Sequence, residues 1–245
     1  MKRPRASERV QGEWLRRVEA EYRSAAVTQH LTLWLIQIGA SPDLLHAGLR
    51  IVRDELAHAA MSHRAFVAAG GNGPPQLARE SLELPRTPGA PLEDDVARVC
   101  LEVFCLGETV AVRLFKELRQ ACDVPVARRV LDRVLRDEVR HRDFGWALLG
   151  WQLDSPAHGG RLRGLVAREL PASFARVRAM YASSGAALEQ TMSREDARWG
   201  LMAAARYGDV LRTTLERDYV PRFARLAVDA REAWGAQPAA GAGPT

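Results

Sequence analysis

The chain has 245 residues, of which 47% are hydrophobic and 27% charged, and its formal net charge at pH 7 is +5. This is the composition of a globular protein with enough apolar side chains for a core, which argues against a wholly disordered chain. No apolar run approaches the ~20 residues of a transmembrane helix, and no apolar stretch follows the basic start to make a signal peptide. We therefore expect a cytoplasmic protein without a membrane partner.

The spacing of the cysteines and the arrangement of the charged residues argue against further classes of protein. Cys100, Cys105 and Cys122 form no C-x-x-C pair, which argues against a zinc ribbon, a rubredoxin-type site and a disulfide framework. The basic balance would permit nucleic-acid binding, but the arginines alternate with Glu and Asp, as in residues 136–138. That pattern is typical of a solvated, ion-paired helix face, so nucleic acid is not an expected partner.

Helical periodicity dominates the chain, and no segment shows the alternation of a strand. The first helix is expected over residues 8–38. Gly39 can supply a left-handed cap, Ser41 an N-cap and Pro42 the first position of a second helix, which runs to about residue 69. A Gly- and Pro-rich connection over residues 70–91 precedes two further helices, residues 92–121 and 125–153.

These four helices make two long hairpins joined by one long connection. A helix of about 30 residues is roughly 45 Å long. The connection, at roughly 3.3 Å per residue, can travel that full length. The sequence therefore predicts an all-α protein in which residues 8–153 form a four-helix bundle with one long crossover.

A helical extension packed on the bundle is expected over residues 161–234. Its candidate helices are residues 161–183, kinked or interrupted at Pro171, residues 193–217 and residues 218–234. The extension could cover the mouth of the bundle, shape a substrate cavity or form the face of a homodimer. The Ala-, Gly- and Pro-rich tail, residues 235–245, is expected to be disordered.

Two Glu-x-x-His motifs carry the chemistry, Glu55 with His58 in the first hairpin and Glu138 with His141 in the second. Residues three apart share a helix face, so a carboxylate and an imidazole can bind one metal ion together. One such motif is easily accidental in a chain with six histidines. Two motifs, one in each hairpin and each preceded by an aspartate, are much harder to attribute to chance.

Each motif has a partner carboxylate on the neighbouring helix. Glu21 and Glu55 flank the first turn at similar separations, and Glu108 and Glu138 flank the second, so antiparallel packing would pair them in height. Four glutamates in an apolar interior are very costly without counter-charge, which two divalent cations would supply. We predict a dinuclear site with six ligands: Glu21, Glu55, His58, Glu108, Glu138 and His141. The alternative is a set of exposed carboxylates paired with arginines.

The repeated pattern of a carboxylate followed some thirty residues later by Asp-Glu-x-x-His resembles the ferritin-like di-iron carboxylate proteins. The second copy, residues 137–141, matches that family's Asp-Glu-x-Arg-His in full, whereas the first, residues 54–58, lacks the arginine. The resemblance implies a ferritin-like bundle whose six ligands bind two iron ions, or a manganese–iron pair. It also implies that Asp54 and Asp137 each orient the histidine of the opposite hairpin, with Arg140 behind the ligands.

Departures from particular members narrow the expected function. Residues 59–62 contain no tyrosine, which argues against a radical-generating subunit like that of ribonucleotide reductase. Val134 stands where arylamine oxygenases carry an extra histidine. The cysteine-rich electron-transfer domain of rubrerythrin is absent.

We expect a non-haem di-iron oxidase or oxygenase that uses O2 to hydroxylate, desaturate or N-oxygenate a small organic substrate. No catalytic residue beyond the metal ligands is expected, and Ala25, Ala111 and Val112 are candidates for lining the substrate pocket. The chain carries no flavin or iron–sulfur motif, so an external electron donor, a ferredoxin or a reductase, is expected. The alternative is a ferroxidase or iron-handling protein without an organic substrate.

Overall fold

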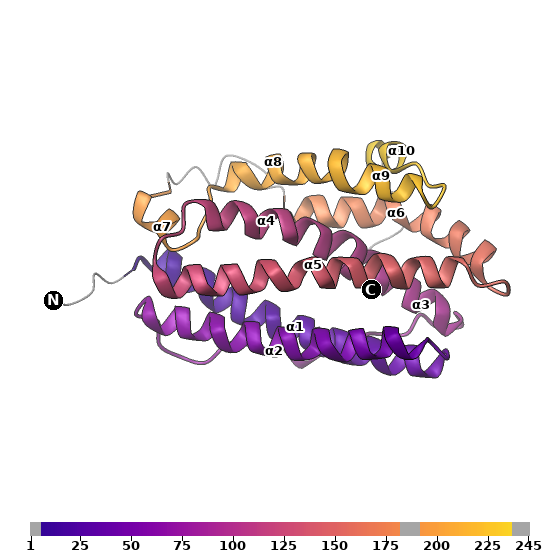
Figure 1. Ribbon diagram of the computed structural model, residues 1–245, viewed down its shortest axis with the longest axis horizontal. Coiled ribbons are helices and arrows are strands. Elements are labelled where there is room, and N and C mark those ends of the chain that lie inside the picture. Colours follow the sequence, from indigo (N-terminus) through magenta and orange to yellow (C-terminus); the bar gives the residue numbers. More distant parts are fainter. Residues whose placement is uncertain (1–5, 182–191, 237–245) are drawn as a thin grey trace. The chain divides into compact units, whose positions relative to one another are not determined.

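The computed structural model describes residues 6–181 and 192–236, and all regular structure in these ranges is helical (Figure 1). The prediction of an all-α protein is confirmed for this part of the chain. The predicted helix end at residue 183 and nearly all of the predicted disordered tail, residues 235–245, lie outside the described residues. None of the described helices combines the length and apolar character needed to cross a bilayer.

The first hairpin consists of α1 (Glu8–Gln37) and α2 (Pro42–Ala68). Gly39 adopts a φ of +69°, the left-handed conformation that a cap after α1 requires. Pro42 is the first residue of α2, as predicted. Ser41 occupies the N-cap position, but its side chain makes no capping hydrogen bond.

The connection after α2 contains one turn of 3-10 helix, η1 (Arg79–Leu82), and makes hydrogen bonds to α1. The Gln76 N–H donates to the Glu19 carboxylate at 2.8 Å, and the Leu84 N–H donates to Nδ1 of His30 at 3.2 Å. These two acceptors on α1 are separated by about 16 Å of helix. The connection therefore runs along α1, as a long crossover does.

The predicted helix over residues 92–121 is continuous but not uniform. It consists of α3 (Leu92–Val99), the π-helix η2 (Cys100–Glu108) and α4 (Thr109–Gln120). A side chain at Gly107 would lie 3.3 Å from the Glu102 carbonyl oxygen, so a residue without Cβ suits this turn. After a short turn, α5 (Pro125–Leu153) completes the second hairpin, as predicted.

Helix α6 (Gly159–Tyr181) continues through Pro171, so an interruption there is wrong. The predicted helix over residues 193–217 is also wrong, because α7 (Arg194–Arg198) and α8 (Ala204–Thr214) are separate. Gly200, between them, has a φ of +80°, which α-helix does not allow.

Side chains of α1 stabilise the break between α7 and α8. The Trp14 indole N–H donates to the Trp199 carbonyl at 3.2 Å, and Arg17 donates to the Gly200 carbonyl at 2.9 Å. A Cβ at Gly200 would approach Leu131 to 2.6 Å, so the glycine also permits close packing. Tertiary contacts thus take the carbonyl groups that a continuing helix would use.

The remaining C-terminal boundaries also differ from the prediction. A second π-helix, η4 (Leu215–Tyr219), joins α8 directly to α9 (Val220–Ala224), so the predicted boundary at residue 217 is wrong. The chain breaks later, where Ala227 has a φ of +57°, before α10 (Ala230–Gly235). Asp229 caps α10 by accepting hydrogen bonds from two backbone N–H groups of its first turn.

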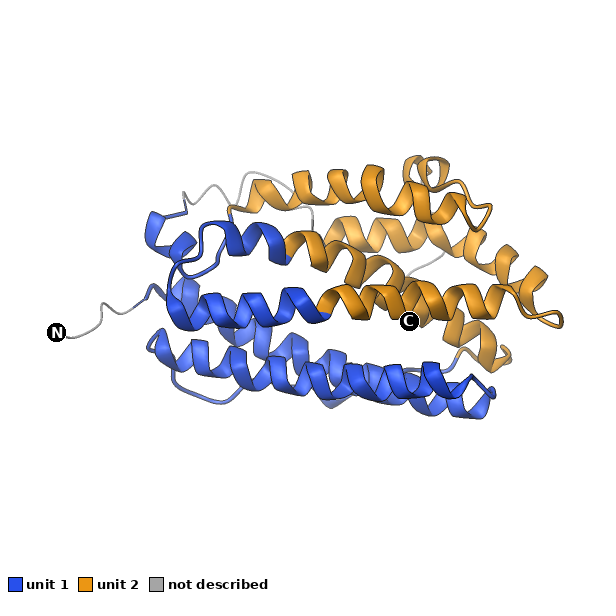
Figure 2. Cartoon of the chain, in the orientation of Figure 1, with its two compact units in different colours: residues 1–86, 115–137, 191–202 blue, residues 87–114, 138–190, 203–245 orange. Residues whose placement is uncertain are grey.

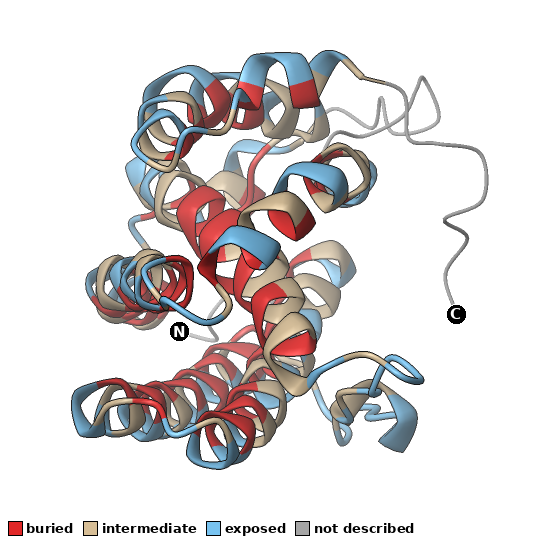
Figure 3. Ribbon diagram, turned by 90° about the vertical axis from the view of Figure 1, so that its right-hand side faces the viewer, coloured by how far each residue is buried: buried red, intermediate tan, exposed pale blue. Residues whose placement is uncertain are grey.

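The chain divides into two compact units (Figure 2). Unit 1 contains Met1–Arg86, Phe115–Asp137 and Thr191–Met202; unit 2 contains Thr87–Leu114, Glu138–Gln190 and Ala203–Thr245. Helices α4 and α5 contribute residues to both units. The long helices have buried residues on one side and exposed residues on the other (Figure 3), as amphipathic helices around a core do.

An aromatic cluster forms part of the core of unit 2. The Phe174 ring lies 5.5 Å from Tyr219, 6.1 Å from Phe223 and 5.1 Å from Trp234, measured between centroids. The Tyr219 hydroxyl donates to the Leu106 carbonyl oxygen at 2.6 Å. The C-terminal helices of unit 2 are thereby bonded to η2.

Candidate metal centre

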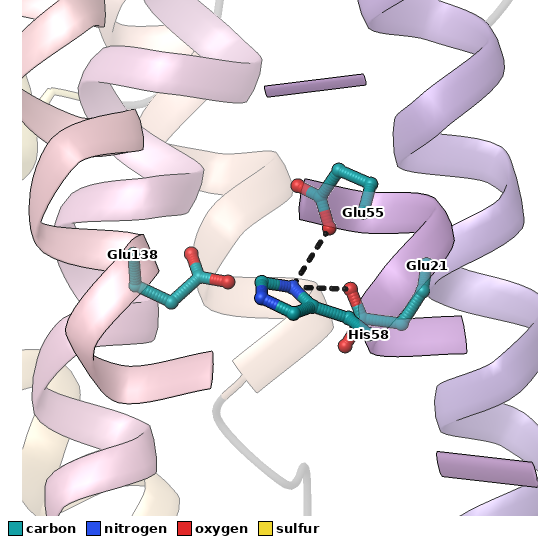
Figure 4. A group of neighbouring side chains, drawn as sticks. All are labelled: Glu21, Glu55, His58 and Glu138. Atoms are coloured by element: carbon teal, nitrogen blue, oxygen red, sulfur yellow. Dashed lines mark hydrogen bonds and ion pairs between the residues drawn. The ribbon is translucent and has the colours of Figure 1, made fainter. Parts of the chain in front are cut away.

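Unit 1 holds a buried cluster of two glutamates and a histidine, the first half-site: Glu21 from α1 with Glu55 and His58 from α2 (Figure 4). Nδ1 of His58 lies 3.3 Å from a Glu55 oxygen and 3.6 Å from a Glu21 oxygen. One ligand atom from each residue lies within 4.8 Å of the other two. This cluster could hold a metal ion.

A serine that the sequence analysis did not select supports this arrangement. The Ser24 hydroxyl donates to Oε1 of Glu55 at 2.8 Å, whereas Oε2 of the same carboxylate faces His58. Ser24 lies one turn after Glu21 on α1, so the bond joins the two helices beside the cluster. It fixes which Glu55 oxygen points toward the histidine.

The second nitrogen of His58 contacts the aspartate that the family resemblance assigns to it. Nε2 lies 3.1 Å from a carboxylate oxygen of Asp137, whose side chain is fully buried. An acceptor at Nε2 favours the neutral imidazole that carries its proton there and directs the Nδ1 lone pair at Glu21 and Glu55. Three electron-rich atoms then face one another, and only a proton or a metal ion between them makes this favourable.

Arg133 connects the two aspartates that precede the motifs. Its Nη2 donates to Oδ1 of Asp54 at 3.0 Å, and its Nε donates to Asp137. The sequence motifs did not identify this residue. Its position four residues before Asp137 on a helix, where an ion pair is expected, was the available signal.

The metal-free cluster retains protons where a cation would bind. Burial and the charge of Glu55 raise the pKa of Glu21 to about 8. Burial disfavours a charge on His58, but its hydrogen bonds to Glu21 and Glu55, with their charges, outweigh that effect and raise its pKa to about 11. Near neutral pH, protons therefore offset part of the negative charge in the cluster.

Unit 2 contains the other three predicted ligands, the second half-site: Glu108, Glu138 and His141. Their exposed fractions are 8%, 3% and 0%, respectively. Nδ1 of His141 lies 3.9 Å from a Glu138 oxygen, and ligand atoms of Glu108 and His141 lie within 4.8 Å of each other. Glu108 is the last residue of η2, so the π-helix ends at a candidate ligand.

The burial of all six predicted ligands contradicts the alternative of exposed carboxylates paired with arginines. The first half-site and the second half-site each combine a Glu-x-x-His motif with the glutamate of its partner helix. Arg140, predicted to lie behind the ligands, is partly exposed on α5.

The residues predicted to line a substrate pocket lie on helices that carry candidate ligands or adjoin such helices. Ala25 is buried one turn after Glu21 in unit 1, and in unit 2 Ala111 is buried and Val112 partly exposed on α4. A cavity of about 270 Å³ in unit 1 lies elsewhere, against residues that include Pro125 and Trp199. It contacts none of the candidate ligands and does not correspond to the predicted pocket.

No protein family model, no curated protein and no solved structure matches this chain. What the fold and the site define is a class: an all-α protein with a buried carboxylate–histidine cluster that could hold a metal ion.

Proposed function

We propose that this chain is a non-haem di-iron oxidase or oxygenase with a ferritin-like bundle, and that its two half-sites form one dinuclear centre. The observation that carries the proposal is the first half-site, in which His58 faces two carboxylates at Nδ1 and a buried aspartate at Nε2. A histidine held in this way by a carboxylate is the usual arrangement of a metal-binding imidazole.

Covalent continuity supports joining the half-sites. Asp137, which contacts His58, directly precedes Glu138 of the second motif on α5. Consecutive Cα atoms are only about 3.8 Å apart. One helix therefore carries both a support of the first half-site and two ligands of the second.

The donor atoms fit iron. Oxygen and nitrogen ligands suit Fe(II) and Mn(II), whereas thiolates would favour zinc, copper(I) or an iron–sulfur cluster. Cys100, Cys105 and Cys122 are buried outside both half-sites. Four carboxylates would balance the charge of two divalent ions, which is why a pair is proposed instead of a single ion.

The bound metal pair would supply the reduction of O2. The residues of the chain would position the metal pair. Asp137 orients His58, Ser24 orients Glu55, and the buried setting limits access of water. In a monooxygenation, one oxygen atom enters the substrate and the other leaves as water, with two electrons and two protons from a donor. The small organic substrate and an external ferredoxin or reductase belong to the proposal.

Anaerobic titration with Fe(II) tests the site. We expect saturation near two ions per chain and a lower stoichiometry for Glu55→Gln and Glu138→Gln. Asp143→Asn is the matched control, because Asp143 lies on α5 with a side chain 55% exposed. Saturation by both ligand variants at the wild-type stoichiometry and affinity would contradict the assignment.

Oxygen uptake by the loaded protein separates the oxidase from the ferroxidase. With a chemical reductant and no added iron, an oxidase or oxygenase consumes O2 over many turnovers while its iron content stays constant. A ferroxidase instead consumes O2 in proportion to added Fe(II) and retains the oxidised product. Uptake of iron far beyond two ions per chain would favour the second function.

A further inference from the structure

We infer that Arg133 is a positioning residue for the metal centre, acting through Asp137 and Asp54. The inference rests on the proposed function, since it concerns how the first half-site is held for metal binding. Arg133 does not itself offer a ligand atom, because a guanidinium only donates hydrogen bonds.

The geometry gives Arg133 two contacts within unit 1. Its Nη2 donates to Asp54 on α2, and its Nε donates to Asp137 on α5. Each aspartate directly precedes the glutamate of a Glu-x-x-His motif. A single planar fork therefore joins the backbones of both motifs, which two independent donors could not do as rigidly.

Charge explains why the contact with Asp137 is needed. The Asp137 side chain is 0% exposed, and a buried carboxylate requires a compensating cation. Arg136 also approaches Asp137, with its Nε 3.5 Å from the carboxylate, but its side chain is 63% exposed.

Loss of Arg133 would therefore change the orientation of the His58 ring without removing any candidate ligand. Asp137 would turn toward another donor, and His58 would lose the acceptor that fixes its tautomer and ring orientation. The Nδ1 lone pair would then no longer be held toward Glu21 and Glu55. We expect weaker metal binding without loss of the fold, because the Arg133 side chain is 36% exposed.

The first measurement is the dissociation constant for Fe(II), taken anaerobically by competition with a chelator. We expect Arg133→Gln to weaken binding about tenfold, the lower end of the effect of removing a partner behind a ligand. Arg133→Lys retains the charge but contacts only one aspartate, so it should recover part of the loss. Arg129→Gln is the control for net charge, because Arg129 is exposed one turn earlier on α5.

The second measurement monitors the His58 imidazole directly. In protein labelled with 15N-histidine and loaded with diamagnetic Zn(II), we expect His58 to bind metal at Nδ1 and to show a slowly exchanging Nε2 proton. Arg133→Gln should make that proton exchange faster while zinc remains bound, and Arg133→Lys should partly restore slow exchange. A role in stability alone would not change this signal.

The outcomes separate the inference from the proposed function. A wild-type chain that binds no Fe(II) overturns the proposed function and this inference with it. A wild-type chain that binds two ions while Arg133→Gln binds them equally tightly, with unchanged exchange at His58, overturns the inference alone. An equal loss of affinity in Arg129→Gln also overturns it, because the effect would then be one of net charge.

Discussion

Two candidate ligands of the first half-site, Glu21 and His58, are expected to make the metal-free protein less stable as the pH rises. Both have a pKa raised by the fold, to about 8 for Glu21 and about 11 for His58. A group with a raised pKa in the folded state stabilises it below its unfolded pKa, and that contribution is lost as the pH rises through the folded value. For Glu21 the loss falls between its ordinary 4.5 and about 8.

Glu21→Gln tests this linkage, because the amide imitates the protonated carboxyl. We expect the stability difference between the variant and the wild type, both in chelator, to shift in favour of the variant from about pH 5 to about pH 8. Urea unfolding at several pH values measures it. A difference that stays constant over this range would refute the assigned direction.

Thr28 gives a residue-scale prediction that does not depend on metal. Its side chain is 0% exposed, and its hydroxyl has no hydrogen-bond partner among the described residues. Thr32 and Thr214, in contrast, donate to the carbonyl four residues earlier. An unsatisfied buried hydroxyl is costly, so Thr28→Val should stabilise the protein by about 1 kcal/mol.

Thermal or urea unfolding of the metal-free protein measures this change. Thr32→Val is the matched control, because it removes a hydroxyl that is bonded at 2.7 Å and should not stabilise the protein. Equal effects of the two substitutions would show that the hydroxyl of Thr28 is satisfied after all.

Spacing along the chain selected the six candidate ligands, but not the residues that support them. Glu-x-x-His is a local pattern, so a helix places its members on one face wherever the helix packs. Ser24 and Arg133 matter only because α1, α2 and α5 pack in a particular register. Nothing local distinguishes Ser24, and the spacing of Arg133 to Asp137 indicates an ion pair within α5 but not the contact with Asp54.

At the scale of elements, the two long hairpins could be predicted because periodicity and capping signals agree over many residues. The π-helix η2 could not, since its winding differs from that of an α-helix by less than one residue per turn over nine residues. The helix breaks at Gly200 and Ala227 also escaped prediction. At Gly200, tertiary contacts of Trp14 and Arg17 with the backbone decide the break.

The packing of η2 against α5 depends on Gly145. A Cβ there would lie 2.4 Å from the Phe104 Cβ and 2.8 Å from its carbonyl carbon, which real structures do not tolerate. The Cys100 thiol also contacts the Gly145 carbonyl oxygen, at 3.2 Å. We expect Gly145→Ala to destabilise the protein by about 2 kcal/mol or more, because backbone must move.

Gly150→Ala on the same helix is the matched control. A Cβ at Gly150 meets nothing within 4 Å, so the substitution should stabilise α5 by about 0.5 kcal/mol through helix propensity. Urea unfolding of the two variants measures both effects. Two changes of the same sign would contradict the close approach of η2 and α5.

At the scale of the whole molecule, the division into units passes between Asp137 and Glu138 and assigns one half-site to each. The repeat in the sequence predicts this symmetry, because each hairpin supplies one motif and one partner glutamate. If the half-sites form the proposed dinuclear centre, metal binding would depend on both units. Two independent mononuclear sites would not.

Single and double histidine variants distinguish these arrangements. If the half-sites share one centre, His58→Ala should weaken binding of both ions, and so should His141→Ala. The double variant should then lose less than the sum of the two single losses in binding free energy, because residues of one site are not additive. Isothermal titration with Fe(II) under anaerobic conditions measures the stoichiometry and both affinities.

Independent sites give the opposite result. Each single variant would retain one ion at its wild-type affinity, and the losses of the two variants would add in the double variant. His63→Ala serves as the control, since His63 is exposed on α2 five residues after His58 and should leave both ions bound. A di-iron oxidase needs both ions at one place to reduce O2. Additive losses would therefore agree with metal binding by the chain but contradict the proposed oxidase function.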